Sequence, residues 1–341
     1  MKCFAAHAIA GLLLLFAREA TACTTFCSRE PLLFGKNYDW SVGDGLLIVN
    51  KRNVEKEALT EDRPARWTSR FGSVTFNQYG REFPNGGMNE RGLVVELMWL
   101  DETEYPAPDA RQGLPNLQWI QYQLDTAATV DDVVASDKRV RITGGGEAKI
   151  HFLVADATGE VAAIEYLKGR MVVHRGAELP HRALTNHTYA TSVEHVRRQI
   201  VGNSRSSLDR FARAARAIDT GPGTVEDAFA VLQNVAQDDD TQWSIVYDIG
   251  ARRVHFRTRT HRDVRWLDLD DLVFGCDTPV QRVSLHDRHR GDLAPQLRPC
   301  TFEANLALVR AAFTQTEFLR GVTAAEIEQH ARFPEQTTCA P

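Results

Sequence analysis

Short runs of β-branched, aromatic and other apolar residues fill the first hundred positions after an apolar start, and Gly, Pro and Asn separate them. Such runs predict strands, because branched and aromatic side chains suit a pleated surface, whereas Gly, Pro and Asn favour turns. The predicted strands are Cys23–Ser28, Leu32–Lys36, Leu46–Asn50, Gly72–Asn77 and Leu93–Leu100.

Helical spacing follows in the next part of the chain. Apolar residues recur at helical intervals over Leu117–Leu124, and Thr129 with Asp132 three residues on resembles a capping box that opens a helix through Ala135. Further helices are predicted around the stripe Phe211, Ala214, Ala215 and Ile218, from the cap formed by Thr224 and Asp227 through Val235, over Thr301–Thr314 and over Thr323–Phe333.

Strand patterns return between these helices. They predict strands at Ile150–Asp156, Val161–Leu167 and Met171–His174, and a hairpin of Trp243–Asp248 with Arg253–Thr258. Clusters of antiparallel strands with separate helices favour an α+β fold. No repeat, low-complexity tract or long linker divides the sequence after the start, so a single domain is predicted for residues 23–341.

The start of the chain has the pattern of a secretory signal peptide. Lys2 precedes the apolar run Ile9–Ala17, which is too short to span a bilayer, and Ala20-Thr21-Ala22 offers the small residues that signal peptidase accepts. We therefore expect residues 1–22 to be removed, so that the mature protein begins at Cys23 and is exported to a periplasm or to the medium. No other segment resembles a membrane span.

The composition is that of a globular protein, with 43% hydrophobic and 25% charged residues in a chain of 341. Forty Lys and Arg residues against 45 Asp and Glu residues give a net charge of -5, and no basic run stands out, which argues against a nucleic-acid partner. Removal of the leader takes away Lys2, Arg18 and Glu19, a net charge of +1, and leaves a mature charge of -6.

Cysteine usage narrows the chemistry. Cys3 lies in the predicted leader, so an odd number of cysteines remains in the exported protein and one thiol must stay unpaired. The remaining cysteines are Cys23, Cys27, Cys276, Cys300 and Cys339. An oxidising compartment allows a disulfide among the last three, and we favour Cys276 with Cys300, although the sequence leaves the connectivity open. Cys23 is our candidate for the unpaired thiol.

A cysteine that becomes the first residue brings a nucleophile and a base together, because its own α-amine lies within reach of its thiol. The amine has a reference pKa of about 7.7–8.0, and it can take the thiol proton and later pass it to a leaving amine. This chemistry suits acyl transfer from an amide. The ordinary interpretation of such a cysteine is a small buried hydrophobic residue, but the position of Cys23 at the predicted cleavage site favours catalysis.

A second candidate cluster is Gly35-Lys36-Asn37-Tyr38-Asp39-Trp40. A cation such as Lys36 near the thiol would stabilise the thiolate, and a carboxylate such as Asp39 near the α-amine would orient it. The alternative is that both are solvated side chains at a strand end and the turn that follows.

Cys23-Thr24-Thr25 after a leader, followed by the Gly35–Trp40 cluster, resembles the opening of the choloylglycine hydrolase and penicillin V acylase family. Its members are N-terminal nucleophile hydrolases whose mature chain starts with the catalytic cysteine. Further matches follow in the family's order, and the last two are similar to its Gram-negative branch. They are Gly87–Leu93, Leu97–Leu100 with Glu104-Tyr105-Pro106, Leu184-Thr185-Asn186, Asp209-Arg210-Phe211, Thr241-Gln242-Trp243 and Trp266–Leu269.

The resemblance implies a four-layer αββα sandwich that hydrolyses a linear amide through an acyl-thioester. It implies Cys23 as nucleophile with its α-amine as general base, and Asp39 as the group that holds both in place. It also implies Arg210 as support for the charged site and Asn186 as oxyanion donor. The substrates it suggests are penicillin V, N-acyl homoserine lactones and conjugated bile acids, and members are often homotetramers. No residue decides among these small-molecule N-acyl amides.

Two departures from the family's pattern bear on the site. Lys36 stands where most members have Arg, so a cation is kept but its bidentate fork is lost. Bile-salt hydrolases of Gram-positive type have an oxyanion asparagine at the place of Trp99. The Gram-negative acylases have Trp there, as this chain does. The tryptophan leaves the identity of the second oxyanion donor open, and it favours penicillin V and N-acyl homoserine lactones as substrates. Trp40 and Trp99 are candidates for lining an apolar acyl pocket, with a place in the core as the alternative.

Two other motifs are weak candidates for a phosphate or metal site. Gly144-Gly145-Gly146 lacks the Lys-Ser/Thr of a phosphate loop and is interpreted as a connection. His286-Asp287-Arg288-His289 has metal-binding residue types, but its charged setting and the lack of a third ligand favour a solvated loop. We therefore predict no metal and no organic cofactor.

Two rival interpretations remain. Cys23 directly after a leader would also suit a lipid-anchored envelope binding protein, in which lipidation and acylation consume the thiol and the amine. Ala20 stands where a leucine usually precedes a lipidated cysteine by three residues, which argues against this rival. The other is a catalytically dead member of the family, for which Lys36 is the best argument.

Overall fold

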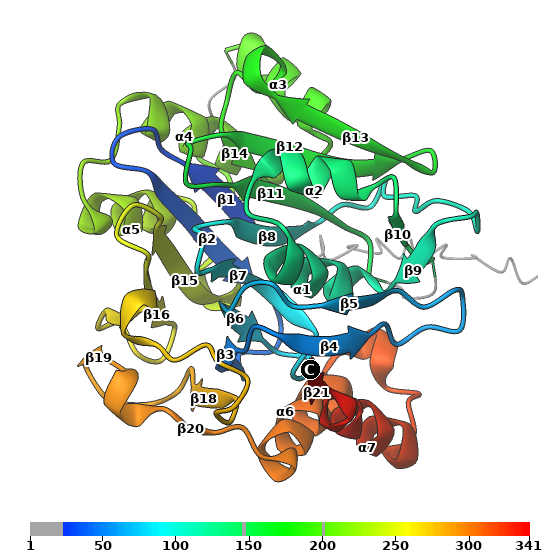
Figure 1. The fold of residues 1–341 in the computed structure, drawn as a ribbon. Helices are drawn as coiled ribbons and strands as arrows, with labels where there is room; N and C mark the ends of the chain where they lie inside the picture. The colour runs from blue at the N-terminus through cyan, green and yellow to red at the C-terminus, as the bar shows by residue number, and fades with distance from the viewer. Residues whose placement is uncertain (1–22, 145–147, 200–201) are drawn as a thin grey trace, which may run out of the picture.

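The computed structural model describes residues 23–144, 148–199 and 202–341, so the predicted leader, and Gly145 and Gly146 of the glycine run, lie outside the described residues. In the described part, two large β-sheets stack face to face, and helices cover the outer face of each (Figure 1). The sequence prediction of an α+β protein with four αββα layers is confirmed.

The first large sheet has the spatial order β14-β1-β2-β15-β16-β17-β19. Its neighbours run antiparallel, except that β17 and β19 run parallel. The strands are β1 (Thr24–Cys27), β2 (Leu33–Asp39), β14 (Ala183–Leu184), β15 (Thr241–Asp248), β16 (Arg253–Thr258), β17 (Arg265–Asp268) and β19 (Gly291–Asp292).

The second large sheet has the order β13-β12-β11-β8-β7-β6-β3-β18-β20. The strands are β3 (Leu46–Asn50), β6 (Ser73–Asn77), β7 (Pro84–Asn89), β8 (Val94–Trp99), β11 (Ile150–Ala155), β12 (Val161–Leu167), β13 (Arg170–Arg175), β18 (Gln281–Ser284) and β20 (Arg298–Pro299). Smaller pairings at the edges join β9 (Gln112–Leu114) to β10 (Val140–Ile142), and β4 (Val54–Glu57) to β5 (Arg66–Thr68) and β21 (Thr338–Cys339).

Helices complete the outer layers. α1 packs on β7 and β8 of the second sheet, while α4 and α5 pack on β1, β2 and β15 of the first. The helices are α1 (Asn116–Thr126), α2 (Val130–Ser136), α3 (Tyr189–Arg197), α4 (Ser207–Asp219), α5 (Val225–Asn234), α6 (Phe302–Gln315) and α7 (Ala324–Arg332). None of the helices in the described ranges is long and apolar enough to cross a membrane.

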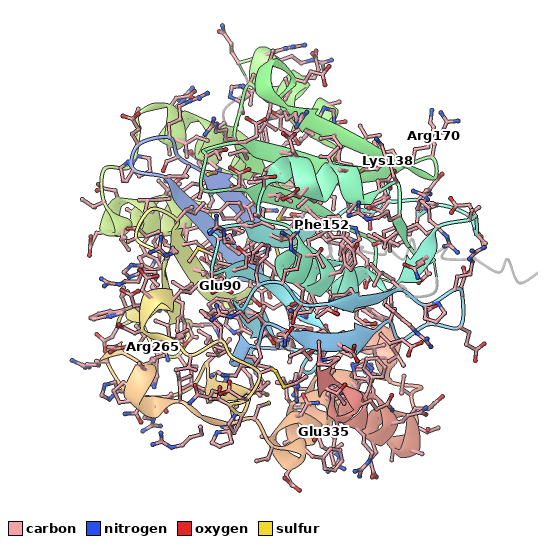
Figure 2. All side chains as sticks on the ribbon, viewed as in Figure 1. Glu90, Lys138, Phe152, Arg170, Arg265 and Glu335 are labelled. Carbon is pink, nitrogen blue, oxygen red and sulfur yellow. A yellow bond between two sulfur atoms is a disulfide. The ribbon has the colours of Figure 1, made fainter. Side chains whose placement is uncertain are left out.

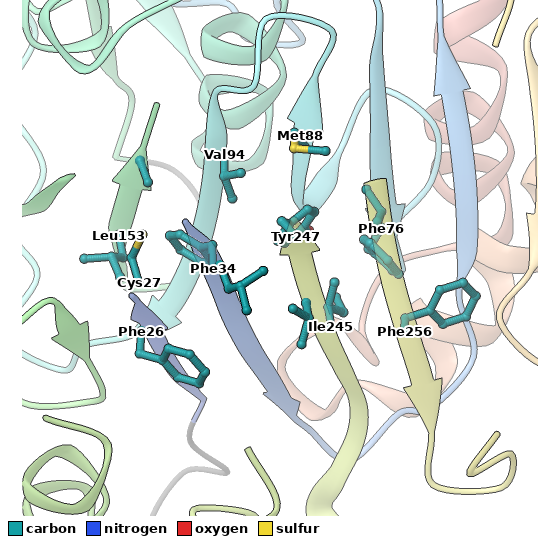
Figure 3. Packing of buried hydrophobic residues seen from close by; sticks show 14 of the residues in the cluster. Phe26, Cys27, Phe34, Phe76, Met88, Val94, Leu153, Ile245, Tyr247 and Phe256 are labelled. Atoms are coloured by element: carbon teal, nitrogen blue, oxygen red, sulfur yellow. The ribbon is translucent and has the colours of Figure 1, made fainter. Parts of the chain in front are cut away.

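The main core lies between the two sheets, where aromatic side chains from both faces interlock (Figure 3). The Phe76 ring of the second sheet meets Tyr247 and Phe256 of the first edge to face, with centroids 6.2 and 5.5 Å apart. Phe152 lies in a second core under α1, whereas charged side chains such as Lys138 point outward (Figure 2). Burial of these rings supplies the hydrophobic driving force that holds the sheets together.

Most predicted elements are confirmed with small changes at their ends. Thr129 and Asp132 form the predicted capping box at the start of α2, and Thr224 caps α5. β2 differs, because it continues through Lys36 to Asp39 and buries both. The alternative in which these side chains are solvated in a turn is therefore wrong.

The last part of the chain forms a separate small cluster beside β3, in which α6 packs against α7. After α7, the short strand β21 pairs with β4, and this pairing brings Cys339 to Cys276. The disulfide is therefore Cys276–Cys339, and our prediction of Cys276 with Cys300 is wrong. Cys300 is a free, half-buried thiol, and Cys23 and Cys27 are free and buried.

Replacing Cys339 by Ser should lower the free energy of unfolding by about 2–4 kcal/mol, because the disulfide closes a long loop in the unfolded chain. The matched variant Cys300→Ser should leave stability close to that of the oxidised parent. Denaturant unfolding of the oxidised proteins measures both. A loss with Cys300→Ser and none with Cys339→Ser would show that the pairing is the other one.

Candidate active site

The antiparallel pair β1 and β2 brings the predicted site residues together. Thr24 lies opposite Asn37 and Thr25 opposite Lys36, so Cys23, just before β1, meets the end of β2. Side chains alternate between the faces of a strand. Lys36 therefore points between the two sheets, while Asp39, three residues on, points to the side covered by α4.

Lys36 is fully buried at the interface of the sheets. Its Nζ donates a hydrogen bond to the carbonyl oxygen of Leu97 and lies 3.7 Å from a carboxylate oxygen of Glu96 on β8. Glu96 also accepts a 2.5 Å hydrogen bond from the hydroxyl of Tyr247. Gly86 makes room for this carboxylate, since a Cβ there would lie 2.2 Å from the Glu96 carboxyl carbon.

Burial raises the pKa of the Glu96 carboxyl to about 7, although Lys36 and Tyr247 oppose the rise. Burial also raises the pKa of the Cys23 thiol, with Lys36 lowering it and Asp39 raising it. A thiol with a raised pKa is mostly protonated near neutral pH. Its use as a nucleophile would therefore require a base, and Lys36 is the cation whose charge lowers the pKa of this thiol.

Arg210 on α4 connects the other candidates. Its buried guanidinium donates from Nη1 to the carbonyl oxygen of Cys23 at 2.9 Å and to the hydroxyl of Thr24, and from Nη2 to Oδ1 of Asn186 at 2.9 Å. The same Nη1 lies 4.0 Å from Oδ2 of Asp39. One side chain thus holds three segments that are distant in sequence.

Asp39 is buried and fully bonded at its carboxylate. Oδ1 accepts a hydrogen bond of 2.5 Å from the Thr241 hydroxyl, and Oδ2 accepts one of 3.1 Å from Gln237. Burial raises the pKa of this carboxyl, and Arg210 and the two hydrogen bonds oppose the rise. The carboxylate is therefore held in one position beside Cys23.

Asn186 is fixed through its side-chain amide and through its backbone. Its Nδ2 donates to the carbonyl oxygen of Trp99 at 2.8 Å, and its backbone N–H donates to the Ser207 hydroxyl at 2.8 Å. Asn186 is not in the cavity wall described below; it reaches Cys23 through Arg210.

A buried network supports the residue before Asn186. A ring nitrogen of His151 lies 2.7 Å from the Thr185 carbonyl oxygen, and its other ring nitrogen lies 3.2 Å from Glu165. Burial opposes ionisation of Glu165, but hydrogen bonds from His151 and His174 outweigh it and hold the pKa of this carboxyl at about 2. The sequence gives no pattern for this network.

A cavity of about 440 Å³ has Cys23 in its wall. Trp40 and Trp99 line it, with ring centroids 6.0 Å apart and planes inclined by 30°. The sequence left both a cavity wall and the core open for these rings; both line the cavity, and Trp40 also packs against the main core. The Trp99 indole donates to the carboxylate of Asp101 at 2.6 Å, which fixes the ring.

The sequence interpretation missed two polar groups in this wall. Asn85 donates to the hydroxyl of Tyr38 at 3.1 Å, and that hydroxyl donates to Gln78 at 2.8 Å. Tyr38 stands within the cluster that we singled out, and Asn85 precedes Gly86-Gly87 in a stretch without strand-forming residues. Only the pairing of β7 beside β6 carries Asn85 to the cavity.

Within the described ranges, no group of three or more His, Cys, Asp or Glu side chains is arranged to hold a metal ion. In the charged loop after β18, His286 instead lies 3.2 Å from the carboxylate of Asp44.

Comparisons with known proteins agree with this architecture. The family model of acyl-coenzyme A:6-aminopenicillanic acid acyl-transferase matches residues 27–262. A penicillin V acylase of Pectobacterium atrosepticum is 26% identical over 320 residues, which cover 77% of this chain and 85% of that protein.

Solved structures give the same picture. A penicillin V acylase from Agrobacterium tumefaciens superposes with a TM-score of 0.72 at 25% identity, over 82% of this chain and 98% of that one. A conjugated bile acid hydrolase from Clostridium perfringens has a TM-score of 0.65 at 15% identity, over 79% and 98%, and shares the fold. The predicted enzyme class, a linear amide hydrolase, is confirmed by these relatives. The chain belongs to the acyl-coenzyme A:6-aminopenicillanic acid acyl-transferase family, and its predicted resemblance to choloylglycine hydrolases and penicillin V acylases is confirmed.

Proposed function

We propose that the mature protein hydrolyses small N-acyl amides with Cys23 as the nucleophile, once removal of residues 1–22 has freed its α-amine. The observation that carries this proposal is the position of Cys23. It is 3% exposed, free of any disulfide, and lies in the wall of an apolar cavity, where the charges of Lys36 and Asp39 act on its thiol.

The first half of the reaction forms a thioester. The thiol proton passes to the α-amine, and the sulfur attacks the carbonyl carbon of the amide to give a tetrahedral anion. The C–N bond then breaks, and the amine departs with the proton that the α-amine returns. Lys36 stabilises the thiolate, and Asp39 holds the α-amine in place.

Water completes the cycle by attacking the thioester, so that the C–S bond breaks, the acid leaves and the thiol regains its proton. In both halves Asn186 is the proposed oxyanion donor. Asn186 lies behind Trp99 of the cavity wall, and in this proposal it must reach the oxyanion past that residue: its Nδ2 carries two hydrogens, and the bond to the Trp99 carbonyl uses one, which leaves the other for the oxyanion. Arg210 positions this amide and the Cys23 carbonyl together.

The two tryptophans support a substrate whose acyl group is flat or apolar. The acyl groups of penicillin V and of N-acyl homoserine lactones fit this description. These amides are our first choices of substrate, followed by conjugated bile acids. The activities of the relatives, a penicillin V acylase and a conjugated bile acid hydrolase, support the same range.

The burial of Cys23 also bears on the rival functions. A lipid-modified cysteine must lie outside the folded body, whereas Cys23 is enclosed and its carbonyl is bonded to Arg210. An inactive member of the family would not need a buried cation at the thiol, yet Lys36 is held there by Glu96 and Leu97. Both observations favour an active enzyme.

Replacing Cys23 by Ala should lower hydrolysis of penicillin V, an N-acyl homoserine lactone and a conjugated bile acid by at least about a thousandfold, because the nucleophile is lost. Cys27→Ala, at the end of β1 and likewise buried, is the matched control and should keep its activity. Turnover by Cys23→Ala close to that of the parent would contradict the mechanism.

Removing the buried ion pair with Lys36→Met/Glu96→Gln should slow alkylation of Cys23 by iodoacetamide near pH 7 by at least about tenfold. Loss of the cation raises the thiol pKa, so the rate-against-pH curve moves to higher pH. Mass spectrometry of the N-terminal peptide measures the rate. Lys51→Met removes a buried lysine bonded to Val273 and Thr278 and is the control, and equal curves for both variants would contradict the role of Lys36.

The protein purified after export from its own leader should have the intact mass of residues 23–341 without an adduct. This mass corresponds to a free thiol and a free α-amine on one residue. A lipid adduct on Cys23, or a first residue other than Cys23, would exclude the proposed base. The native mass of the same sample tests the homotetramer that the family resemblance implies.

A further inference from the structure

One wall of the cavity comes from a part of the chain outside the family match. The match ends at residue 262, whereas Phe313, Phe318, Leu319 and His330 line the cavity from α6, the turn after it and α7. We infer that this C-terminal segment selects the acyl group, with Phe318 as a specificity-determining residue for uncharged aromatic acyl groups. The inference rests on the proposed function, since it concerns the substrate of the same site.

The ring of Phe318 faces the two tryptophans. Its centroid lies 6.5 Å from that of Trp40, at an interplanar angle of 67°, and 6.2 Å from that of Trp99, at 42°. With 6.0 Å between the tryptophans, the three rings are at the separations at which aromatic groups attract one another edge to face or offset. A further aromatic ring entering the cavity meets the same kind of partners.

Phe318 does not serve the core of its own segment. That core consists of residues such as Val309, Ile327 and Ala331, and Phe302 packs against it, whereas Phe318 belongs to none of the hydrophobic clusters among the described residues. The ring contacts it makes in the described part are those with Trp40 and Trp99. Its half-buried position is therefore explained by the cavity and not by the packing of α6 and α7.

The segment is held firmly against the second sheet at the turn between β6 and β7. Next to Phe318, the hydroxyl of the buried Thr316 lies 3.2 Å from that of Tyr79. His330 bonds the Tyr79 carbonyl at 2.9 Å, and Asn305 accepts from the Arg81 backbone at 2.8 Å. These bonds hold the segment that carries Phe318 in place, and a fixed wall discriminates between acyl groups better than a mobile one.

The cavity wall also favours an acyl group without charge. Among the described residues that line the cavity there is no Asp, Glu, Lys or Arg side chain. Burial lowers the pKa of His330 to about 4, so this ring is neutral at pH 7. A carboxylate at the far end of an acyl chain would lose its hydration without gaining a partner. The chemistry therefore fits phenoxyacetyl or phenylacetyl groups and excludes dicarboxylic acyl chains.

The test compares amides that share one chromogenic amine and differ in the acyl group, which is phenoxyacetyl, cyclohexyloxyacetyl or acetyl. Phe318→Ala should lower kcat/KM for the phenoxyacetyl amide by at least about tenfold, chiefly through KM, and change the acetyl amide by less than about twofold. The parent should prefer phenoxyacetyl to cyclohexyloxyacetyl, and Phe318→Trp should restore most of that preference.

The control is Phe302→Ala, which removes a ring of the same size from the same segment. Phe302 packs under the guanidinium of Arg332 and is not in the cavity wall. It should leave the acyl preference unchanged. Equal losses for the phenoxyacetyl and acetyl amides with Phe318→Ala, or the same loss with Phe302→Ala, would overturn the inference.

A binding measurement separates this inference from the proposed function. Phenoxyacetamide should quench the tryptophan fluorescence of Cys23→Ala, and Cys23→Ala/Phe318→Ala should bind it at least about tenfold more weakly. If the parent cleaves none of the amides while this difference in binding is found, the proposed hydrolysis fails and the acyl site stands. Equal binding by the two variants overturns the inference.

Discussion

The buried guanidinium of Arg210 is the interaction on which the rest of the site depends. A buried cation with many N–H donors is tolerated only where those donors find acceptors, and removing a partner of a buried charge costs about 3–5 kcal/mol. Arg210 finds its acceptors at Cys23, Thr24 and Asn186. The need to satisfy one side chain therefore fixes the start of β1, the loop after β14 and α4 relative to one another.

A second buried cation acts on the opposite side of the same strands. Lys36 cannot form the bidentate contacts of an arginine, and the structure compensates with a carboxylate, Glu96, and a backbone carbonyl, Leu97, at one amine. The charges that act on the thiol are thus a cation held from the second sheet and a carboxylate held by Thr241 of β15, by Gln237 and by Arg210 of α4. Because the sheets are packed by interlocked aromatic rings, neither charge can move away from Cys23 without disturbing the core.

The elements and the candidates nearest Cys23 were accessible from the sequence because they depend on local patterns, whereas the four-layer fold was implied by the family resemblance. Strand periodicity and caps predict the elements, and a cysteine behind a predicted leader, with Lys36 and Asp39 close in sequence, predicts the chemistry. The errors share a physical cause. The disulfide of Cys276 depends on β21 pairing with β4, and Asn85 reaches the cavity only through the order of strands in a sheet. Such contacts are set by tertiary packing, which leaves no local signal.

The position of Phe318, in the region that determines selectivity, is also set by tertiary packing and could not be predicted from local sequence patterns. Its neighbours in sequence are Glu317 and Leu319, and nothing in that turn indicates a partner, yet its ring lies beside Trp40, nearly three hundred residues earlier. The charged machinery around Cys23 is built from the two sheets and α4, all of it within the family match, whereas the rings that contact an acyl group come partly from the segment beyond it. Since the segment adds no charged group to the cavity wall among the described residues, it can change the acyl preference without altering the pKa of the nucleophile. Chemistry and selectivity are thus separated along the chain, and substitutions in the C-terminal segment act on one without the other.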